Sequence, residues 1–446
     1  MNTKLSILHR DFPLSAFAIS LTATLLVLVE GLVWIVQQSA FAMQFNAGDF
    51  LFHFGPAALM TLCTVLLLHH PIHNKLLGLG IGFAALLSLF AGGGFLAGLT
   101  LGIIGAVLAV TWHSNRRIIA PISNRLTKIG RRNRMLALLA VIAIAVAVSI
   151  PTELSYQIAI NNVQQSQLAG SQIINTAHGQ IEYVDVGSGV PVLVSHGAGM
   201  GYMQLGSIQA MLGNESYRFI VPSRYGYLRT PMQADSSFAA QADSFADLLD
   251  ALNISKVVIM GVSIGGPAAL QFALRHPDRC SALIMASAIS HNTPDFDAVG
   301  IIMHQGVFRS DFGFYMLSTA LQSMLLQFLG VSSEVQANMT AADKQYVNDM
   351  ISAMQPISLR QDGLVNDAER SQTELTLNLT QIRMPTLIFH AKDDGLVNFE
   401  FGQYTASHIP NAEFISFEYG GHLLVGCVGQ IHDSTERFLR ENSVLQ

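Results

Sequence analysis

Short β-rich runs alternate with helical stretches along the last two thirds of this 446-residue chain. The run Val257–Met260 is wholly apolar, which is typical of a central parallel strand that is buried on both faces. Strands that alternate with helices form βαβ units and a mainly parallel sheet covered on both faces. We therefore predict an α/β domain with an eight-stranded, mainly parallel sheet, whose strands are Gln172–Ala177, Gln180–Val186, Pro191–Ser195, Arg218–Val221, Lys256–Met260, Ala282–Ala286, Thr386–His390 and Glu413–Phe417.

Residues from about 290 to 375 interrupt this alternation. They carry helical, Met-rich stretches such as Phe314–Phe328 and no strand pattern. We predict a helical cap inserted over the carboxyl edge of the sheet, where open α/β sheets bind their ligands. Its apolar side chains favour a small hydrophobic ester or a lipid as substrate, and they include Met303, Phe312, Phe314, Met316, Leu325 and Phe328.

The first third of the chain has a different character. Over the whole chain, half of the residues are apolar and only 12% are charged. This charged fraction is about half that of an ordinary soluble domain. Apolar runs cover about 14–36, 50–68, 76–110 and 135–151. The third run is too long for one membrane span of about 20 residues, and we divide it at Gly92-Gly93-Gly94. Residues 1–153 are therefore predicted to be a transmembrane region with five spans, at about 14–36, 50–68, 76–91, 95–111 and 135–151.

The distribution of charge gives this region an orientation. Residues 1–153 hold ten Lys and Arg against four Asp and Glu, and the remaining residues are net acidic. Seven basic residues and no acidic residue lie between the fourth and fifth predicted spans. The positive-inside rule then places the N-terminus in the cytoplasm and everything after the fifth span outside it. Residues 154–171 are rich in Gln, Asn and Ser and are predicted to be a linker. Nothing in the charge pattern indicates a nucleic acid as partner.

The three cysteines form neither a disulfide framework nor a metal-ligand spacing. They are Cys63, Cys280 and Cys427. A Cys280–Cys427 bridge in an oxidising compartment and two buried free thiols are both compatible with the sequence.

The segment Gly261-Val262-Ser263-Ile264-Gly265 carries the first catalytic candidate. It follows the buried strand and opens a helical stretch, and this strand–turn–helix context is what a nucleophile elbow requires. Gly261 and Gly265 leave out side chains that would clash in the sharp turn. The turn exposes the hydroxyl of Ser263, so we predict Ser263 as the nucleophile.

A second glycine-rich turn, His196-Gly197-Ala198-Gly199, follows the strand Pro191–Ser195. Such a turn aims backbone N–H groups at a developing oxyanion. The predicted donors are the N–H groups of Ala198 and Ile264, the latter being the residue after the nucleophile. His196 and Gly197 are predicted to support the turn, and His196 is not predicted to act as a base.

The acid and base candidates follow two later strands. Asp394 lies just after Thr386–His390, and His422 lies just after Glu413–Phe417. The chain order Ser, Asp, His is the order in which the triad occurs in folds that carry such a nucleophile elbow. His422 would accept the Ser263 proton, and Asp394 would fix the His422 tautomer and stabilise the imidazolium. Asp393 is the competing acid.

Residues 172–446 resemble the α/β-hydrolase superfamily, particularly its esterase-, lipase- and C–C-hydrolase-like members with a helical cap. The matching pieces are His196-Gly197, Gly261-Val262-Ser263-Ile264-Gly265-Gly266, Pro385–His390 with Asp394 behind it, and Gly420-Gly421-His422. In the acid motif of that superfamily, G-x-x-D-x-x-V-P, the aspartate stands three residues after the glycine. Ala391 replaces that glycine here, and the spacing selects Asp394. Ser223–Tyr227 resembles a degraded turn motif, to which we assign no chemistry.

This resemblance implies a serine hydrolase that needs no metal and no cofactor and cleaves a carboxylic ester or thioester through an acyl-enzyme. C–C bond hydrolysis and acyl transfer use the same triad and remain alternatives. A non-catalytic receptor or assembly protein that retains the fold is the alternative from a different class. A transport function of residues 1–153 is less favoured, because the predicted spans contain few charged residues beyond Glu30.

Overall fold

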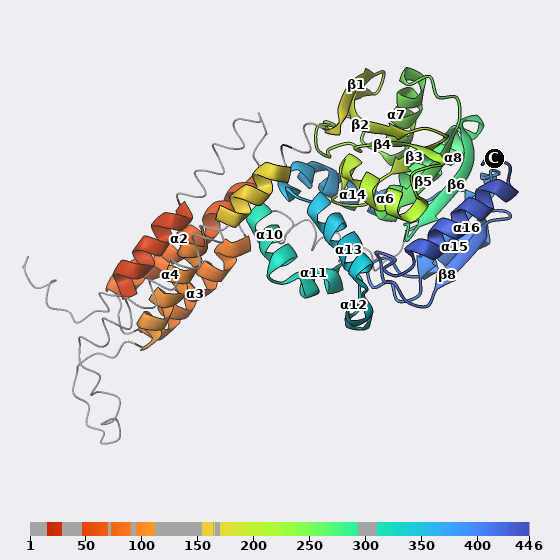
Figure 1. Cartoon of the computed structure of the whole chain (residues 1–446). Coiled ribbons are helices and arrows are strands. Elements are labelled where there is room, and N and C mark those ends of the chain that lie inside the picture. Colours follow the sequence, from red (N-terminus) through yellow and green to blue (C-terminus); the bar gives the residue numbers. More distant parts are fainter. Residues whose placement is uncertain are drawn as a thin grey trace, which may run out of the picture. The chain divides into compact units, whose positions relative to one another are not determined.

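The computed structural model describes residues 16–28, 47–69, 73–90, 95–111, 154–163, 165, 170–292 and 310–445. The chain divides into two compact units, Met1–Ala159 and Ile160–Gln446, which are coloured from red to yellow and from yellow to blue in Figure 1.

The first unit is helical wherever it is described. Residues 16–28 are helical, and they are followed by α2 (Ala47–His69), α3 (Asn74–Phe90) and α4 (Phe95–Thr111). In these residues, no helix is both long enough and apolar enough to cross a membrane. At 1.5 Å per residue, the 17 residues of α3 or α4 reach only about 25 Å. The five-span prediction is thus not supported by the described residues, and its fifth span, 135–151, lies outside them.

Small residues let α3 and α4 approach closely. A Cβ on Gly102 would lie 2.5 Å from the Cβ of Ala85, and one on Gly78 would lie 2.9 Å from the carbonyl oxygen of Ala106. Large apolar side chains instead face outward from the unit, among them Leu76 at 70% exposure and Leu79 at 65%. The first unit therefore has a core rich in alanine and a surface with exposed apolar side chains.

Residues 154–163, which belong to the predicted linker, are helical. The linker assignment itself stays a prediction. Leu154 and Ile158 lie four residues apart, and Ile160 and Val163 lie three residues apart, which are helical spacings.

An eight-stranded sheet forms the centre of the second unit, in the order β1-β2-β4-β3-β5-β6-β7-β8. The first two strands are antiparallel to their neighbours, and all later pairs are parallel. All eight predicted strands are present, with ends within two residues of those predicted. Their bounds are β1 (Gln172–Thr176), β2 (Gly179–Gly187), β3 (Val190–Ser195), β4 (Tyr217–Pro222), β5 (Val257–Val262), β6 (Cys280–Ala286), β7 (Thr386–Ala391) and β8 (Glu413–Phe417).

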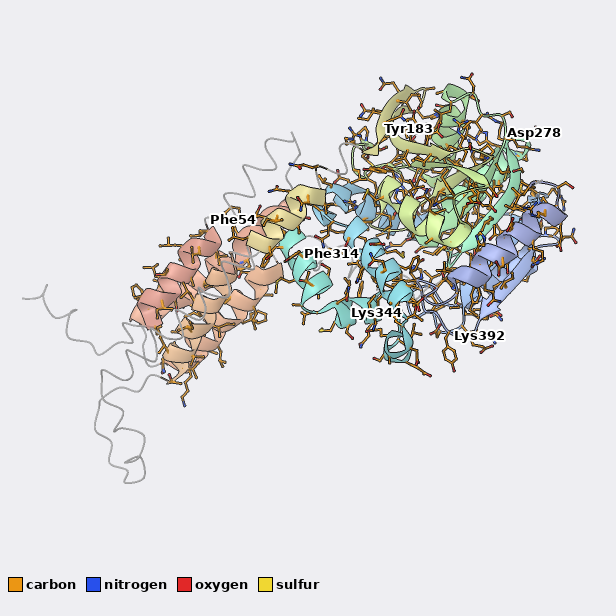
Figure 2. All side chains as sticks on the ribbon, in the orientation of Figure 1. Phe54, Tyr183, Asp278, Phe314, Lys344 and Lys392 are labelled. Carbon is orange, nitrogen blue, oxygen red and sulfur yellow. The ribbon has the colours of Figure 1, made fainter. Side chains whose placement is uncertain are left out.

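Successive side chains of a strand point to opposite faces, and this separates two hydrophobic layers. In β5, Val257 and Ile259 pack in one layer with α7 (Phe238–Ala251), α8 (Gly266–Arg275) and α15 (Glu400–His408). Val258 and Met260 pack in the other with α6 (Leu205–Leu212) and α16 (Val428–Glu441). In Figure 2 the labelled Tyr183 belongs to this buried interior, whereas Lys392 lies at the surface. The sheet is thus covered on both faces, as an α/β domain requires.

Within the predicted cap, the described residues from Ser310 onward are mainly helical. It contains α10 (Asp311–Thr319), α11 (Gln322–Phe328), α12 (Ser333–Asn338), α13 (Ala341–Ala353) and α14 (Gln361–Thr373), and α10 to α13 are cyan in Figure 1. Phe314 and Leu325 lie in the hydrophobic layer that the cap shares with the sheet. The cap and the sheet therefore form one continuous core.

The three thiols are free and buried, so Cys280 and Cys427 are not bridged. Burial raises the pKa of each of these two thiols to about 12, with acidic neighbours contributing further at Cys427. We expect that Ellman's reagent at pH 8 titrates neither thiol in the native chain and both after denaturation, since the thiolate is the reacting form. Rapid reaction of either thiol in the native protein would contradict this structure.

Candidate active site

Ser263 lies directly after β5 and begins a 3-10 helix, Ser263–Gly265, that leads into α8. Its φ is +51°, a left-handed conformation that is uncommon for a residue with a side chain. Pro267 occupies the first turn of α8, where no backbone donor is lost. The chain thus turns sharply at Ser263 and places its side chain at the carboxyl edge of the sheet.

Two glycines make this turn sterically possible. A Cβ on Gly265 would lie 2.0 Å from the carbonyl oxygen of Ser195 and 2.5 Å from that of His196, both of which are backbone atoms. A Cβ on Gly261 would lie 2.8 Å from the side chain of Ala269. The turn after β5 therefore packs directly against the end of β3.

Gly265→Ala should destabilise the second unit by roughly 2–3 kcal/mol, because overpacking against backbone atoms forces the turn to move. Pulse proteolysis of the full chain in urea would measure this loss. Gly429→Ala is the matched control, since no atom lies within 4 Å of the added Cβ and the site is in α16; it should be neutral or slightly stabilising. Equal stability of the two variants would contradict the close packing at Gly265.

The structure brings the three predicted side chains together. The hydroxyl of Ser263 donates to Nε2 of His422 over 3.0 Å, and Nδ1–H of His422 donates to Oδ2 of Asp394 over 2.9 Å. All three residues are at most 9% exposed. Ser263, Asp394 and His422 follow β5, β7 and β8, three strands whose carboxyl ends share one edge of the sheet.

Asp394 is held by more than the imidazole. Its Oδ1 accepts the N–H groups of Leu396 and Val397 at 2.9 and 2.8 Å, and Nε2 of His390 lies 3.2 Å from Oδ2. Burial raises the pKa of this carboxyl, but the neighbouring His422 charge and the hydrogen bonds from both histidines outweigh burial and hold the pKa well below its usual range. Asp394 is therefore ionised at neutral pH.

Asp393 has a different partner. Its Oδ1 accepts the N–H of Gly421, the residue before His422, over 2.8 Å. The His422 N–H in turn donates to the carbonyl oxygen of Gly330, in the cap, over 3.3 Å. Asp393 and the cap therefore position the loop that carries the imidazole, whereas Asp394 contacts the imidazole itself.

The turn after β3 and the elbow after β5 each carry one of the two predicted oxyanion donors, Ala198 and Ile264. The N–H groups of Ala198 and Ile264 donate no hydrogen bond to any part of the chain that the structure describes. Gly197 packs beside the nucleophile, because a Cβ there would lie 3.3 Å from the Cβ of Ser263. Two N–H groups that are free to donate therefore lie near the Ser263 hydroxyl, as stabilisation of an oxyanion requires.

His196 is wholly buried and supports this turn. Its Nδ1–H donates to the carbonyl oxygen of Gly197 over 2.8 Å, and its Nε2 accepts the N–H of Arg224 over 2.9 Å. Burial, and then the Arg224 guanidinium, hold the pKa of His196 well below its usual range. A neutral ring with both nitrogens occupied cannot exchange protons with a substrate.

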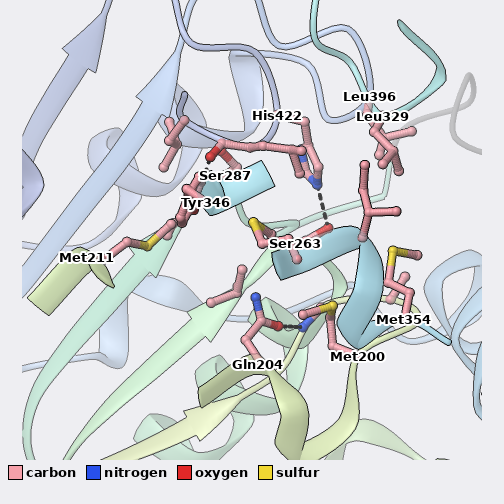
Figure 3. Close-up of a pocket in the computed structure, with 18 residues that line it drawn as sticks. Met200, Gln204, Met211, Ser263, Ser287, Leu329, Tyr346, Met354, Leu396 and His422 are labelled. Atoms are coloured by element: carbon pink, nitrogen blue, oxygen red, sulfur yellow. Dashed lines mark hydrogen bonds between the residues drawn. The ribbon is translucent and has the colours of Figure 1, made fainter. Parts of the chain in front are cut away.

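A pocket that is partly open to solvent lies over Ser263 and His422. Figure 3 shows Ser263 and His422 joined by a hydrogen bond, with Met200, Met211, Leu329 and Met354 around them. The cap contributes Leu329, Tyr346, Met350, Ile351 and Met354 to the lining. Most of the lining is apolar, so the cavity suits a hydrophobic ligand.

Several site residues had no recognisable sequence signal. Gln204 is buried, and its Oε1 accepts the N–H of Gly197 over 2.7 Å, which fixes the oxyanion turn. Arg224, in the turn to which no chemistry was assigned, forms a buried bidentate ion pair with Asp367 of α14. Of the cap residues expected to face a substrate, Phe314 and Leu325 are core residues and do not line the cavity, and Met303 lies outside the described residues.

A family model described as the alpha/beta hydrolase fold matches residues 190–425, more than half of the chain. The chain belongs to the alpha/beta hydrolase fold family. The match includes the elbow at Ser263, the Asp394 loop and His422, and it excludes the first unit. The second unit is accordingly that of a hydrolase.

Individual relatives match a similar share of the chain. An uncharacterized hydrolase, YcgS, of Bacillus subtilis (strain 168) is 28% identical over 55% of this chain and 89% of its own length. The 2-hydroxymuconate semialdehyde hydrolase of Pseudomonas putida is 27% identical over 59% of this chain and 91% of its own length. An alpha/beta hydrolase fold protein from Nakamurella multipartita has a solved structure with a TM-score of 0.49 and 25% identity, covering 61% of this chain and 99% of that chain.

Proposed function

We propose that this hydrolase cleaves a carboxylic ester or thioester through a covalent acyl-enzyme on Ser263. The observation that carries the proposal is the hydrogen-bonded series from Ser263 Oγ to His422 and on to Asp394, at 3.0 and 2.9 Å. A serine hydroxyl is a weak nucleophile unless a base accepts its proton. His422 is placed to accept it, and the ionised Asp394 stabilises the resulting imidazolium.

In the first half of the proposed reaction, Ser263 Oγ forms a bond to the carbonyl carbon while its proton passes to His422 Nε2. The negative charge collects on the carbonyl oxygen, where the N–H groups of Ala198 and Ile264 stabilise it. Collapse of this intermediate breaks the bond to the leaving oxygen or sulfur. His422 returns its proton to that leaving atom, and the acyl group stays on Ser263.

In the second half, water replaces the leaving group. His422 accepts a proton from the water as its oxygen attacks the acyl carbon, and the same two N–H groups stabilise the second oxyanion. Collapse breaks the bond to Ser263 Oγ, which takes the proton back from His422. The carboxylic acid leaves and the site is restored.

The cavity favours an uncharged, hydrophobic acyl group. Its described lining residues include no lysine, arginine, aspartate or glutamate. Burial raises the pKa of Tyr346, which is therefore neutral. An anionic acyl chain would lose its hydration without gaining a cationic partner, so a carboxylesterase- or lipase-like specificity fits this lining.

C–C bond hydrolysis is the second candidate, because one relative is named a 2-hydroxymuconate semialdehyde hydrolase. That reaction uses the same triad, with carbon in place of oxygen as the leaving atom. Acyl transfer also remains open, since an alcohol can replace water in the second half.

A substrate panel separates these reactions. We expect the full chain to hydrolyse p-nitrophenyl esters of butyrate to decanoate, with Ser263→Ala as the blank, and to release acid even when methanol or glycerol is added. A kcat/KM for a vinylogous 1,5-diketone that exceeds those for all esters by orders of magnitude would favour C–C hydrolysis. Ester product formed with the added alcohol in preference to acid would favour acyl transfer.

We also propose that the first unit attaches the enzyme to a membrane, with the hydrolase unit outside the cytoplasm. The exposed apolar side chains of α3, such as Leu76, Leu79 and Phe83, and the basic stretch 116–134 support this proposal. The native chain should stay in the pellet after alkaline carbonate extraction, and an alkaline phosphatase fused near Gly170 should be active. Extraction of the chain into the supernatant would overturn the proposed membrane attachment. An inactive phosphatase would overturn the placement of the hydrolase unit outside the cytoplasm.

A further inference from the structure

Ser287 combines two features that nothing in the proposed triad chemistry explains. It follows β6 directly and has a φ of +44°, a left-handed conformation for a residue with a side chain. It is 2% exposed, and its hydroxyl has no hydrogen-bond partner in the described part of the chain. A strained backbone and an unpaired buried hydroxyl both cost free energy, and such costs persist mainly at functional sites.

The location of Ser287 distinguishes it from other unpaired groups. Within the described residues, eight buried side-chain atoms lack a partner, and Ser287 is the one such residue that also lines the cavity over Ser263. The other polar side chains of the lining are engaged: Gln204 with Gly197, Tyr346 with the carbonyl oxygen of Leu423, and Ser263 with His422. Among the described residues that line the cavity, Ser287 is therefore the one whose hydroxyl makes no hydrogen bond.

The sheet register places Ser287 beside the nucleophile. Val262 of β5 pairs with Ala286 of β6, so Ser263 and Ser287 are the next residues on two neighbouring parallel strands. Neighbouring strands lie about 4.8 Å apart. The Ile289 N–H donates to the carbonyl oxygen of Ser263 over 3.0 Å and holds the two segments together. A group bound by Ser287 would thus lie within a few atoms of the carbonyl carbon that Ser263 attacks.

We propose that Ser287 binds the substrate, and that the substrate is a neutral ester or thioester whose acyl chain carries a hydrogen-bonding oxygen two to four atoms beyond the scissile carbonyl carbon. A hydroxyl both donates and accepts, so a keto, hydroxyl or ether oxygen satisfies it. A carboxylate is disfavoured at this position, because no lysine or arginine is among the described lining residues. This inference rests on the proposed ester hydrolysis and names its substrate class.

The test moves one oxygen along the acyl chain. The substrates are the p-nitrophenyl esters of hexanoate, propoxyacetate, 3-ethoxypropanoate and 4-methoxybutanoate, which differ only in one CH₂ replaced by oxygen. Each kcat/KM is divided by the rate of hydroxide hydrolysis of the same ester, which removes the inductive effect of the oxygen. The wild type should favour one oxygen-containing ester over hexanoate by about tenfold, as one neutral hydrogen bond in a buried site allows. Ser287→Ala should abolish that preference.

Ser195→Ala is the matched control. Ser195 is also fully buried, its hydroxyl also lacks a partner among the described residues, and it does not line the cavity. Both variants remove an unpaired hydroxyl, so neither should lower the thermal midpoint. Ser195→Ala should retain the wild-type ratio between the esters. A ratio that stays unchanged in Ser287→Ala, or that disappears equally in both variants, would overturn the assignment.

A binding measurement keeps this inference separate from the proposed hydrolysis. The N-methylamides of the same four acids are titrated calorimetrically into Ser263→Ala and into the Ser263→Ala/Ser287→Ala double variant. A preference for one oxygen-containing amide in the first protein and none in the second supports Ser287 even if no ester is hydrolysed. Equal affinities of all four amides for Ser263→Ala would overturn the role of Ser287, whatever the outcome for esters.

Discussion

Replacing Asp394 by asparagine should lower kcat for ester hydrolysis by about four orders of magnitude while leaving KM nearly unchanged. The reason is the orientation of the asparagine side-chain amide relative to His422. Oδ1 of Asp394 accepts the N–H groups of Leu396 and Val397, so only the carbonyl oxygen of an asparagine can occupy that position. The NH₂ group must then face Nδ1 of His422.

An NH₂ group that donates to Nδ1 selects the His422 tautomer with its proton on Nε2. That nitrogen lies 3.0 Å from Ser263 Oγ and can then no longer accept the serine proton. Steady-state kinetics with p-nitrophenyl esters would measure the loss, and an unchanged urea midpoint would show that the fold is retained.

Asp393→Asn is the control, because it makes the same chemical change one residue away. Oδ1 of Asp393 accepts the Gly421 N–H, which an asparagine oxygen can also do, whereas Nδ1 of His422 has Asp394 as its partner. Activity should stay within about tenfold of the wild type. If Asp393→Asn were the more damaging change, the assignment of the catalytic acid would be wrong.

Asp367→Ala should lower the free energy of unfolding of the second unit by about 3–5 kcal/mol, the usual loss when one partner of a buried ion pair is removed. The Arg224 guanidinium is fully buried and donates to both carboxylate oxygens of Asp367, over 2.5 and 2.6 Å. Removing the carboxylate leaves that charge without water and without its main partner. Because Arg224 also donates to Nε2 and to the carbonyl oxygen of His196, the oxyanion turn should loosen as well.

Pulse proteolysis in urea would measure this destabilisation. The double variant Arg224→Met/Asp367→Leu should recover much of the loss, because it buries apolar groups of similar size instead of one charge. Glu413→Ala removes a carboxylate from a more exposed pair with Arg437 and should change stability far less. A loss at Asp367→Ala no greater than that at Glu413→Ala would contradict a tightly packed ion pair between the cap and the turn.

The sheet was predictable because its signal is local. Each strand is a short run of apolar or β-branched residues between turn residues, and Val257–Met260 fits a strand buried on both faces. The elbow and the two loops that carry Asp394 and His422 follow such strands directly. The carboxyl ends of parallel strands lie at one edge of the sheet. Three side chains that each follow such a strand could therefore be expected at the same edge from the sequence alone.

The remaining site residues depend on contacts between distant segments. Arg224 and Asp367 are 143 residues apart, and neither residue type indicates a buried pair by itself. Ser287 is an ordinary residue at the end of a strand until the structure shows its φ and its unpaired hydroxyl. The helix at 154–163 was not predicted, because its polar composition indicated only a linker, and the lengths of α3 and α4 do not support a five-span count.

Fluorophosphonate labelling tests the central claim most directly, since this reagent reacts with a serine only when a neighbouring base activates it. The full chain and Ser263→Ala are each treated with the probe, and the labelled peptide is identified by mass spectrometry. We predict one modified serine, Ser263, in the wild type and none in the variant. Equal labelling of both proteins, or no labelling of the folded wild type, would contradict the role of Ser263 as an activated nucleophile.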